Sequence, residues 1–273
     1  MKAYEVLDFV AGKLEIPLKD FPDGGFIIGN GSDEVKGILV TWLADMDALR
    51  TAIKKGFNLI ICHEQFYWDE REEIWPYREA GTFKKPLDWR RHPNNAIKET
   101  AEKNDLIILQ IHYGLDRAYI FDEFFRKLGI TEVVSGSIYE KVYRLPSPMR
   151  FGKLVEHVAE KIKAPMMRIL GDEDRIIKLA GNGCGGTGLF CNRYFTRRLF
   201  EDGADVVICG ELDEMAFFFA KECGGCLIET SHVLSENIGI SQFSRDIEKK
   251  FGIPVFFYEV KIPYNVRMPS SSI

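Results

Sequence analysis

The sequence lacks an excess of basic residues. It holds 36 lysines and arginines against 41 aspartates and glutamates, which gives a formal net charge of −5 and a pI near 5.7. Binding to nucleic acid or to an anionic membrane surface depends largely on positive charge that faces the phosphates. We therefore expect neither nucleic acid nor a membrane among the partners of this protein.

Long apolar runs are missing as well. No stretch approaches the roughly 20 apolar residues that a membrane span requires. The N-terminus also has no basic segment followed by a short apolar region, the pattern of secretory signals. On this basis we expect a cytoplasmic protein.

Cysteines are few, at six in 273 residues, and we expect them to be reduced. Cys62 and Cys209 end apolar stretches, where a thiol acts as a small hydrophobic group. The single pair Cys223-Gly224-Gly225-Cys226 has no second pair to complete a zinc site, and it runs into an apolar stretch. We therefore favour neither a redox centre nor a zinc site at this pair.

The composition is that of an ordinary globular protein, with 46% hydrophobic and 28% charged residues. The length favours two modest domains or one large one. Pro146-Ser147-Pro148 interrupts the apolar pattern and predicts a junction. We assign residues 1–146 to a first α/β half and residues 147–273 to a second.

Apolar periodicity predicts alternating helices and strands. An opening helix is expected over residues 2–14. A strand at 37–42, a helix at 47–55 and a strand at 57–62 then form a β-α-β unit, whose crossover implies parallel pairing. The same alternation in the second half predicts an α/β fold with mainly parallel sheets.

One pattern occurs twice in the chain. Residues 105–116 and residues 225–236 both consist of an apolar strand followed by His-x-x-x-acid. Upstream, residues 57–64 parallel residues 204–211, and each of these stretches follows a helix that ends in glycine. Two related halves are the economical explanation.

The ends of these strands carry three histidines and three carboxylates. They are His63, Glu64, His112, Asp116, His232 and Glu236. The carboxyl edge of a parallel sheet is where α/β proteins usually place their chemistry, although each motif alone also fits a strand that turns into solvent. Imidazoles and carboxylates suit borderline or hard divalent ions, and carboxylates can bridge two of them. The set therefore favours a dinuclear metal site.

A helix is predicted from residue 235 to residue 251, which places Glu236 in its first turn. The glycine-rich stretch 181–188 is interpreted either as a wall of an active site or as a tight turn. It is not a phosphate-binding lysine loop, because no Lys-Ser/Thr follows it. Residues 68–93 mix tryptophan and tyrosine with charged residues, which fits either a contact surface or a self-packed surface loop.

Over nearly its whole length the chain resembles the NIF-three-like family of dinuclear-metal proteins, often labelled GTP cyclohydrolase I type-two homologues. Five motifs carry the resemblance: Leu-Ile-Ile-Cys-His-Glu-Gln at 59–65, His-Tyr-Gly-Leu-Asp at 112–116, Gly-Cys-Gly-Gly at 183–186, Gly210-Glu211, and His-Val-Leu-Ser-Glu at 232–236. The last is the most specific. The resemblance implies a NIF-three-like fold of two α/β halves about a pseudo-twofold axis, assembled as a homohexamer.

For the site, the resemblance implies metal ligands and one nearby group. The ligands are His63, Glu64, Asp116, His232 and Glu236, with Glu236 placed to bridge two ions and His112 close by as a base or orienting group. Glu64 stands where the family has a second histidine, and Glu211 where it usually has aspartate. A carboxylate in place of an imidazole makes the site harder and more anionic. The cofactor is therefore expected to be two divalent ions, of zinc, iron or manganese.

Two functions of different classes follow. The first is a metal-dependent hydrolase that acts on a small phosphorylated or nucleotide-like substrate, with His112 as the candidate catalytic residue. The second is a non-catalytic metal-binding assembly or regulatory scaffold protein, for which residues 68–93 would offer the contact surface. The coordination of the metal distinguishes the two functions. A metal site that is open to substrate fits the hydrolase, and a site that protein ligands close fits the scaffold.

Overall fold

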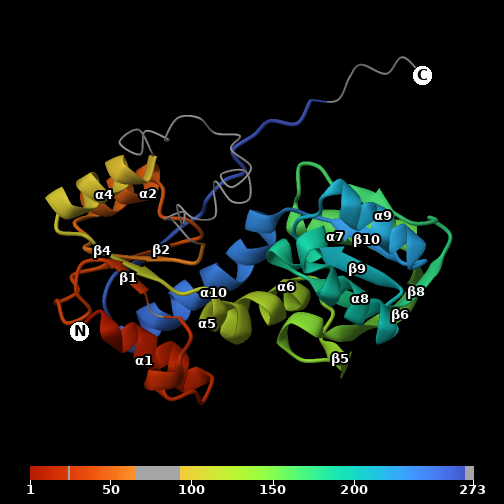
Figure 1. Ribbon diagram of the computed structural model, residues 1–273, viewed down its shortest axis with the longest axis horizontal. Helices are drawn as coiled ribbons and strands as arrows, with labels where there is room; N and C mark the ends of the chain where they lie inside the picture. The colour runs from red at the N-terminus through yellow and green to blue at the C-terminus, as the bar shows by residue number, and fades with distance from the viewer. Residues whose placement is uncertain (24, 65–92, 268–273) are drawn as a thin grey trace, which may run out of the picture. The chain divides into compact units, whose positions relative to one another are not determined.

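The computed structural model describes residues 1–23, 25–64 and 93–267, which form two compact α/β units (Figure 1). The first unit comprises Met1–Gly114 and Ser244–Tyr258, and the second comprises Leu115–Phe243 and Glu259–Ile273. This confirms the predicted α/β class. In the described part of the chain, no helix is long and apolar enough to cross a membrane.

The first unit is built on a five-stranded sheet with the order β1-β4-β3-β2-β11. Its strands are β1 (Gly25–Ile28), β2 (Ile38–Thr41), β3 (Leu59–Cys62), β4 (Ile107–Gln110) and β11 (Val255–Tyr258). Its own helices are α1 (Tyr4–Lys13), the short η1 (Leu18–Asp20), α2 (Met46–Lys55) and α4 (Pro93–Lys103). Only β1 runs antiparallel to its neighbour. In Figure 1, α2 and α4 lie on one side of this sheet and α1 on the other.

The local sequence explains these elements. Every residue of β2 and β3 is buried, as expected for central strands covered on both faces. The helix α2 begins at the Asp45 cap, whose carboxylate accepts a hydrogen bond from the Ala48 amide at 2.8 Å. It ends at Gly56, which adopts the left-handed conformation with φ of 70°.

The second unit is built on a six-stranded sheet with the order β5-β6-β8-β9-β10-β7. Its strands are β5 (Glu132–Ser135), β6 (Val142–Arg150), β7 (Ile169–Leu170), β8 (Ile176–Gly183), β9 (Val206–Cys209) and β10 (Cys226–Glu229). The strands β8, β9 and β10 are parallel, and the other pairs are antiparallel. Both sheets are therefore mixed, and the second is less parallel than expected.

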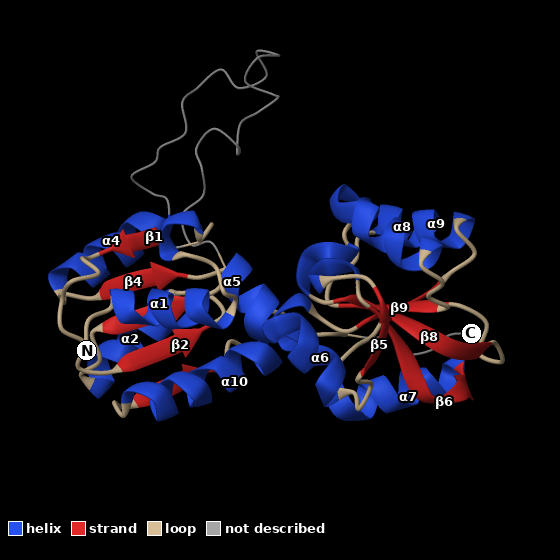
Figure 2. Cartoon of the chain, turned by 90° about the horizontal axis from the view of Figure 1, so that it is seen from below, coloured by secondary structure: helices blue, strands red, loops and turns tan. Residues whose placement is uncertain are grey.

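Helices cover both faces of the second sheet. The helices of this unit are the π-helix η3 (Asp116–Ile120), α6 (Phe121–Lys127), α7 (Phe151–Ile162), α8 (Arg193–Glu201) and α9 (Glu214–Glu222), with short turns η4 (Ile138–Glu140), η5 (Gly185–Gly188) and η6 (Phe190–Asn192). The short α5 (Tyr113–Leu115) and the long α10 (His232–Phe251) each contribute residues to both units. Figure 2 shows α8 and α9 on one face and α7 on the other. Leu199 of α8 and Ala216 of α9 pack in one core cluster with Val207 of β9.

The chain crosses between the units differently from the prediction. The expected junction at Pro146 lies inside β6, which pairs with β8, and the expected edge strand at 141–145 is flanked by β5 and β8. The last strand, β11, joins the first sheet beside β2. Since β2 is apolar and fully buried, it needs a neighbour on each side to satisfy its backbone. The expected segment 68–93 lies outside the described residues, apart from Pro93 at the start of α4.

The sequence repeat corresponds to two pairs of parallel strands. In the first unit, β3 pairs with β4, so that Cys62 lies opposite Gln110. In the second unit, β9 pairs with β10, so that Cys209 lies opposite Glu229. The side chains that follow each pair therefore emerge together at one edge of their own sheet.

The helix α10 begins at His232, earlier than the predicted start at residue 235. Glu236 is therefore one turn into the helix, and the two side chains lie on the same face at i and i+4. Further along α10, Gly239 packs against η3. A Cβ atom at Gly239 would lie 2.5 Å from the Cα atom of Ile120, so only glycine allows this approach.

We predict that Gly239→Ala destabilises the protein by about 1–3 kcal/mol, because the added methyl group forces α10 and η3 apart. Gly12→Ala in α1 is the matched control, since no atom lies within 4 Å of a Cβ there. The control should gain up to about 1 kcal/mol from helix propensity. Urea unfolding measures both variants. Equal shifts for the two would contradict the close packing of α10 on η3.

Candidate metal centre

The first unit brings three candidate ligands together. His63, Glu64 and His112 each offer one ligand atom, and these atoms all lie within 4.8 Å of one another. His63 follows β3 directly and is fully buried. Its Nδ1 atom lies 3.2 Å from the Ile111 carbonyl oxygen. Because a carbonyl can only accept, Nδ1 carries the proton and donates it, and Nε2 keeps the lone pair that a metal requires.

His112 lies against the other two members of this set. Its ring stacks on the His63 ring with centroids 4.4 Å apart and planes inclined by 14°. Its Nε2 atom lies 3.8 Å from Glu64 Oε1. The His112 side chain is 48% exposed, whereas His63 is buried. His112 is therefore the member of the set that solvent or a small molecule reaches most easily.

The second unit holds the other three predicted ligands. His232 Nε2 lies 3.2 Å from Glu236 Oε1, and ligand atoms of Asp116 and Glu236 lie within 4.8 Å of each other. Asp116 and Glu236 are each only 3% exposed. Burying two carboxylates side by side is unfavourable unless a cation or protons offset their charge. The sequence thus located a buried acidic pair as well as a histidine.

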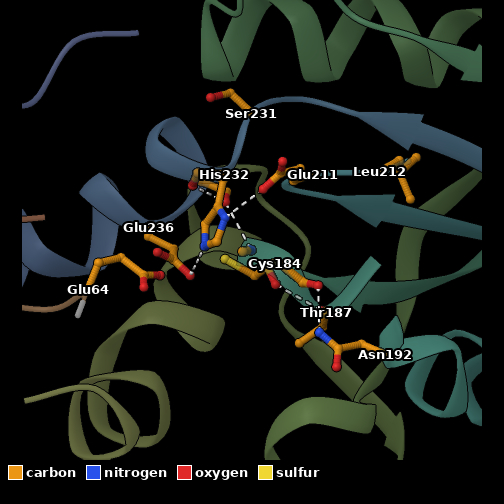
Figure 3. Close-up of polar contacts among 12 residues, drawn as sticks. Glu64, Cys184, Thr187, Asn192, Glu211, Leu212, Ser231, His232 and Glu236 are labelled. Carbon is orange, nitrogen blue, oxygen red and sulfur yellow. Dashed lines mark hydrogen bonds and ion pairs between the residues drawn. The ribbon is translucent and has the colours of Figure 1, made fainter. Parts of the chain in front are cut away.

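His232 lies between two carboxylates (Figure 3). Its Nδ1 atom is 2.9 Å from Glu211 Oε2, and its Nε2 atom is 3.2 Å from Glu236. A neutral imidazole has one N–H and can donate to only one of them. The second contact requires added positive charge, as a second proton on the ring, a proton on one of the carboxylates or a bound cation. When Nδ1 keeps its proton and donates a hydrogen bond to Glu211, Nε2 has a free lone pair and is oriented as a metal ligand.

Asp116 is held by an aromatic side chain that the sequence did not indicate. The Tyr139 hydroxyl donates to Asp116 Oδ2 at 3.0 Å. Tyr139 also packs edge-on against Phe121. Its neighbour Ile138 has φ of 36°, a conformation that β-branched residues rarely adopt. Backbone strain of this kind is often found at functional sites, and Asp116 itself lies in a π-helix, which shows the same tendency.

The glycine-rich stretch packs against Glu236 and includes the tight turn η5 at Gly185–Gly188, so both of its interpretations stay open. Gly185 has φ of 63°, and a Cβ atom there would lie 2.0 Å from Glu236 Oε1. The Gly185 amide donates to Ser235 Oγ at 3.1 Å, and Ser235 Oγ donates to the His232 carbonyl at 2.8 Å. Glycine at position 185 therefore lets the backbone of the loop pack directly against the Glu236 carboxylate. The imidazole and carboxylate donors beside this loop are of the kind that a divalent ion binds.

An ion pair with a buried glutamate fixes the loop that carries Glu211. Glu229, the last residue of β10, accepts hydrogen bonds from Arg168 Nη2 at 2.6 Å and from the Leu212 amide at 2.8 Å. Arg168 also packs over the Phe217 ring at 5.2 Å. Sequence analysis did not single out this pair. The signal was present, because a glutamate that ends a fully apolar strand is costly to bury without a partner.

The buried cysteines take no part as charged groups in the metal-free chain. Burial raises the pKa of the Cys62 thiol to about 12. Burial also raises the pKa of Cys184 well above its ordinary value, and the negative charges of Glu236 and Asp116 raise it further. Both remain neutral thiols at physiological pH, which for Cys62 agrees with its expected role as a small apolar group. All six cysteines are free.

We predict that Tyr139 and Asp116 are energetically coupled. A hydrogen bond to a buried charged group contributes about 1.5–3 kcal/mol. Tyr139→Phe, Asp116→Ala and the double variant form a cycle in which this coupling is measured by urea unfolding in chelator. Additive losses in the double variant would show that the hydroxyl does not hold the carboxylate.

Comparison with known proteins agrees with the resemblance seen in the sequence. The sequence model of the Duf34/NIF3 (NGG1p interacting factor 3) family matches residues 1–263. A protein of Archaeoglobus fulgidus named GTP cyclohydrolase 1 type 2 homolog is 22% identical over 264 residues, which cover 95% of this chain and 98% of that protein. A protein of the same name from Allochromatium vinosum is 26% identical over 136 residues, and that match spans 49% of each chain.

Solved structures show the same fold. The hypothetical protein SA1388 of Staphylococcus aureus superposes with a TM-score of 0.74 at 17% identity, covering 98% of this chain and 99% of that chain. A Bacillus cereus protein related to NIF3 also superposes with a TM-score of 0.74, at 14% identity and with the same coverage of both chains. The matches in sequence and fold extend over nearly the whole chain, and this protein therefore belongs to the Duf34/NIF3 family.

Proposed function

We propose that this protein binds two divalent ions and uses them to hydrolyse a small phosphorylated or nucleotide-like substrate. The proposed ligands are His63, Glu64, Asp116, His232 and Glu236. The observation that carries the proposal is His232, whose two ring nitrogens both face carboxylates. Membership of the Duf34/NIF3 family and the separate His63, Glu64 and His112 set in the first unit support it.

The chemistry of the donors narrows the choice of metal. Imidazole nitrogen suits zinc and iron, and carboxylate oxygen also suits manganese. Divalent ions of this kind activate water and stabilise the charge that develops on oxygen during hydrolysis. Glu236 contributes the negative charge that offsets two cations, and we propose that it bridges them. Glu64 makes the set more anionic than a second histidine would.

The remaining residues orient the proposed ligands or transfer protons. Glu211 fixes the ring of His232 through Nδ1. His112 is half exposed beside Glu64, so it is the group that we propose to accept a proton from, or deliver one to, the substrate. Gly185 lets the glycine-rich loop pack against Glu236 without a side-chain clash. By the family resemblance, we propose that the chain works as a cytoplasmic homohexamer.

Glu236→Gln tests the bridging role. The substitution keeps the size of the side chain and removes the charge that offsets the cations, so binding of both ions should weaken together. In chelator the variant should be about as stable as the wild type, because Glu236 repels Asp116 when no cation is present. With Mn²⁺ or Zn²⁺ at about 100 times the dissociation constant, the wild type should gain about 2.7 kcal/mol of stability, and the variant far less.

Glu248→Gln is the control for this experiment, since it makes the same change on the same helix away from the ligands. Melting temperature with chelator and with added metal measures all three proteins. Equal metal shifts in the wild type and in Glu236→Gln would remove the bridging assignment.

A hydrolysis assay tests the catalytic role. Protein loaded with Mn²⁺ or Zn²⁺ is offered phosphomonoesters, phosphodiesters, cyclic nucleotides and GTP, and we expect turnover that chelator abolishes. His112→Asn should keep the metal content and lower kcat by about 10²- to 10⁴-fold, the usual contribution of a general acid or base. An unchanged kcat in this variant would remove His112 from the chemistry.

The same assay separates the two classes of function. Well-metallated protein that turns over no substrate on the whole panel would contradict the hydrolase proposal. Stable metal binding without turnover would instead favour the assembly or regulatory scaffold.

A further inference from the structure

The second unit contains a cavity of about 290 Å³ that none of the candidate metal ligands lines. It is bounded by the end of α6, the residues that follow it, part of β6 and one face of α7. Figure 1 labels both helices. The cavity is therefore a separate feature from the metal centre and needs its own explanation.

The floor of the cavity is apolar. Leu128 and Ile130 follow α6 and are 1% and 2% exposed, and Leu154 of α7 is fully buried. These side chains belong to the core of the unit and present only carbon to the cavity. Water gains few hydrogen bonds against such a surface, so an apolar group is a better occupant.

The rim of the cavity is basic. Arg126 and Lys127 at the end of α6 and Lys161 on α7 line it, and no aspartate or glutamate does so among the described residues. Arg126 is paired with Glu123, which leaves the two lysines as the cations that we consider for a ligand. Lys127 forms no salt bridge within the described part of the chain. Lys161 is 3.6 Å from its sequence neighbour Glu160, whose side chain is 76% exposed and not part of the lining. The positive charge at the rim is thus not neutralised by the cavity wall.

The helix α7 aligns these groups. Leu154, His157 and Lys161 are spaced by three and four residues, so they lie on one helical face. His157 Nε2 donates to the Leu128 carbonyl at 2.6 Å and so joins α7 to the end of α6. This bond satisfies a carbonyl that the helix end would otherwise leave open. The two lysines are held at the same cavity because these two segments are joined.

Basic residues in the last turn of a helix also stabilise its dipole, and Lys127 and Lys161 both occupy such positions. A lysine at a helix end has this effect on the dipole even when its side chain only extends into solvent. The effect does not explain why both lysines line an apolar cavity that no carboxylate lines in the described part of the chain. A ligand with an apolar body and an anionic head complements both parts of the wall.

We propose that this cavity binds a small organic anion, with its apolar body on Leu128, Ile130 and Leu154 and its carboxylate or phosphate head between Lys127 and Lys161. The volume lies at the lower end of the range of about 300–1,000 Å³ for small-molecule pockets, so the ligand has the size of a single substituted ring. The site is independent of the metal centre.

The experiment uses the full chain in chelator, so that no anion is held by a metal. Titration calorimetry measures the binding of benzoate, phenyl phosphate, inorganic phosphate and the neutral benzamide. Benzoate and phenyl phosphate should bind with 1:1 stoichiometry, and the tighter of the two identifies the head group. Benzamide and inorganic phosphate should each bind at least tenfold more weakly, since each lacks one half of the complementarity.

Two double variants complete the test. Lys127→Gln with Lys161→Gln should weaken binding of the better anion at least tenfold. Lys153→Gln with Lys178→Gln makes the same change in net charge at lysines that do not line the cavity, and binding should be unchanged. The proposal would be overturned if both double variants weakened binding equally, or if the wild type showed no saturable binding. It would also be overturned if benzamide bound as tightly as benzoate, or inorganic phosphate as tightly as phenyl phosphate.

Discussion

The arrangement of the candidate metal centre depends on one imidazole held between two carboxylates. His232 contacts Glu211 through Nδ1 and Glu236 through Nε2, at 2.9 and 3.2 Å. One neutral ring cannot donate a hydrogen bond to both carboxylates, so the second contact needs an additional positive charge, from a proton or from a bound cation. A divalent ion supplies that charge and also offsets Asp116, which is buried beside Glu236. An added proton or a bound cation meets this electrostatic requirement, and we propose that a divalent ion does so.

The surrounding elements keep that group in place. Glu229 ties the loop of Glu211 to the end of β10, and Tyr139 holds Asp116 from a strained turn. Gly185 allows the glycine-rich loop to pass Glu236 without a side-chain clash. Each of these contacts is satisfied within the second unit. The geometry of the candidate ligands is thus fixed by the fold, and this preorganisation would lower the cost of binding an ion.

Much of the fold and of the candidate site was predictable from the sequence, and the features that could not be predicted were missed for physical reasons. Apolar strands ending in His-x-x-x-acid indicated the strand pairs and the ligand candidates, because strand ends of parallel pairs emerge together. The start of α10 at His232 was missed, since the helical apolar pattern begins only at residue 235. Tyr139 was missed because its hydroxyl reaches Asp116 from a turn 23 residues away, and no local pattern reports such a contact. The pairing of β11 with β2 is equally non-local.

Anomalous scattering from crystals grown with Zn²⁺ tests the central claim most directly. The account predicts an anomalous peak about 2.0–2.1 Å from His232 Nε2, the usual distance between zinc and a histidine nitrogen. Glu236 should coordinate the same ion, while Glu211 should keep its hydrogen bond to Nδ1. Zinc bound only elsewhere, for instance at the exposed Cys191 or Cys223, would contradict the account.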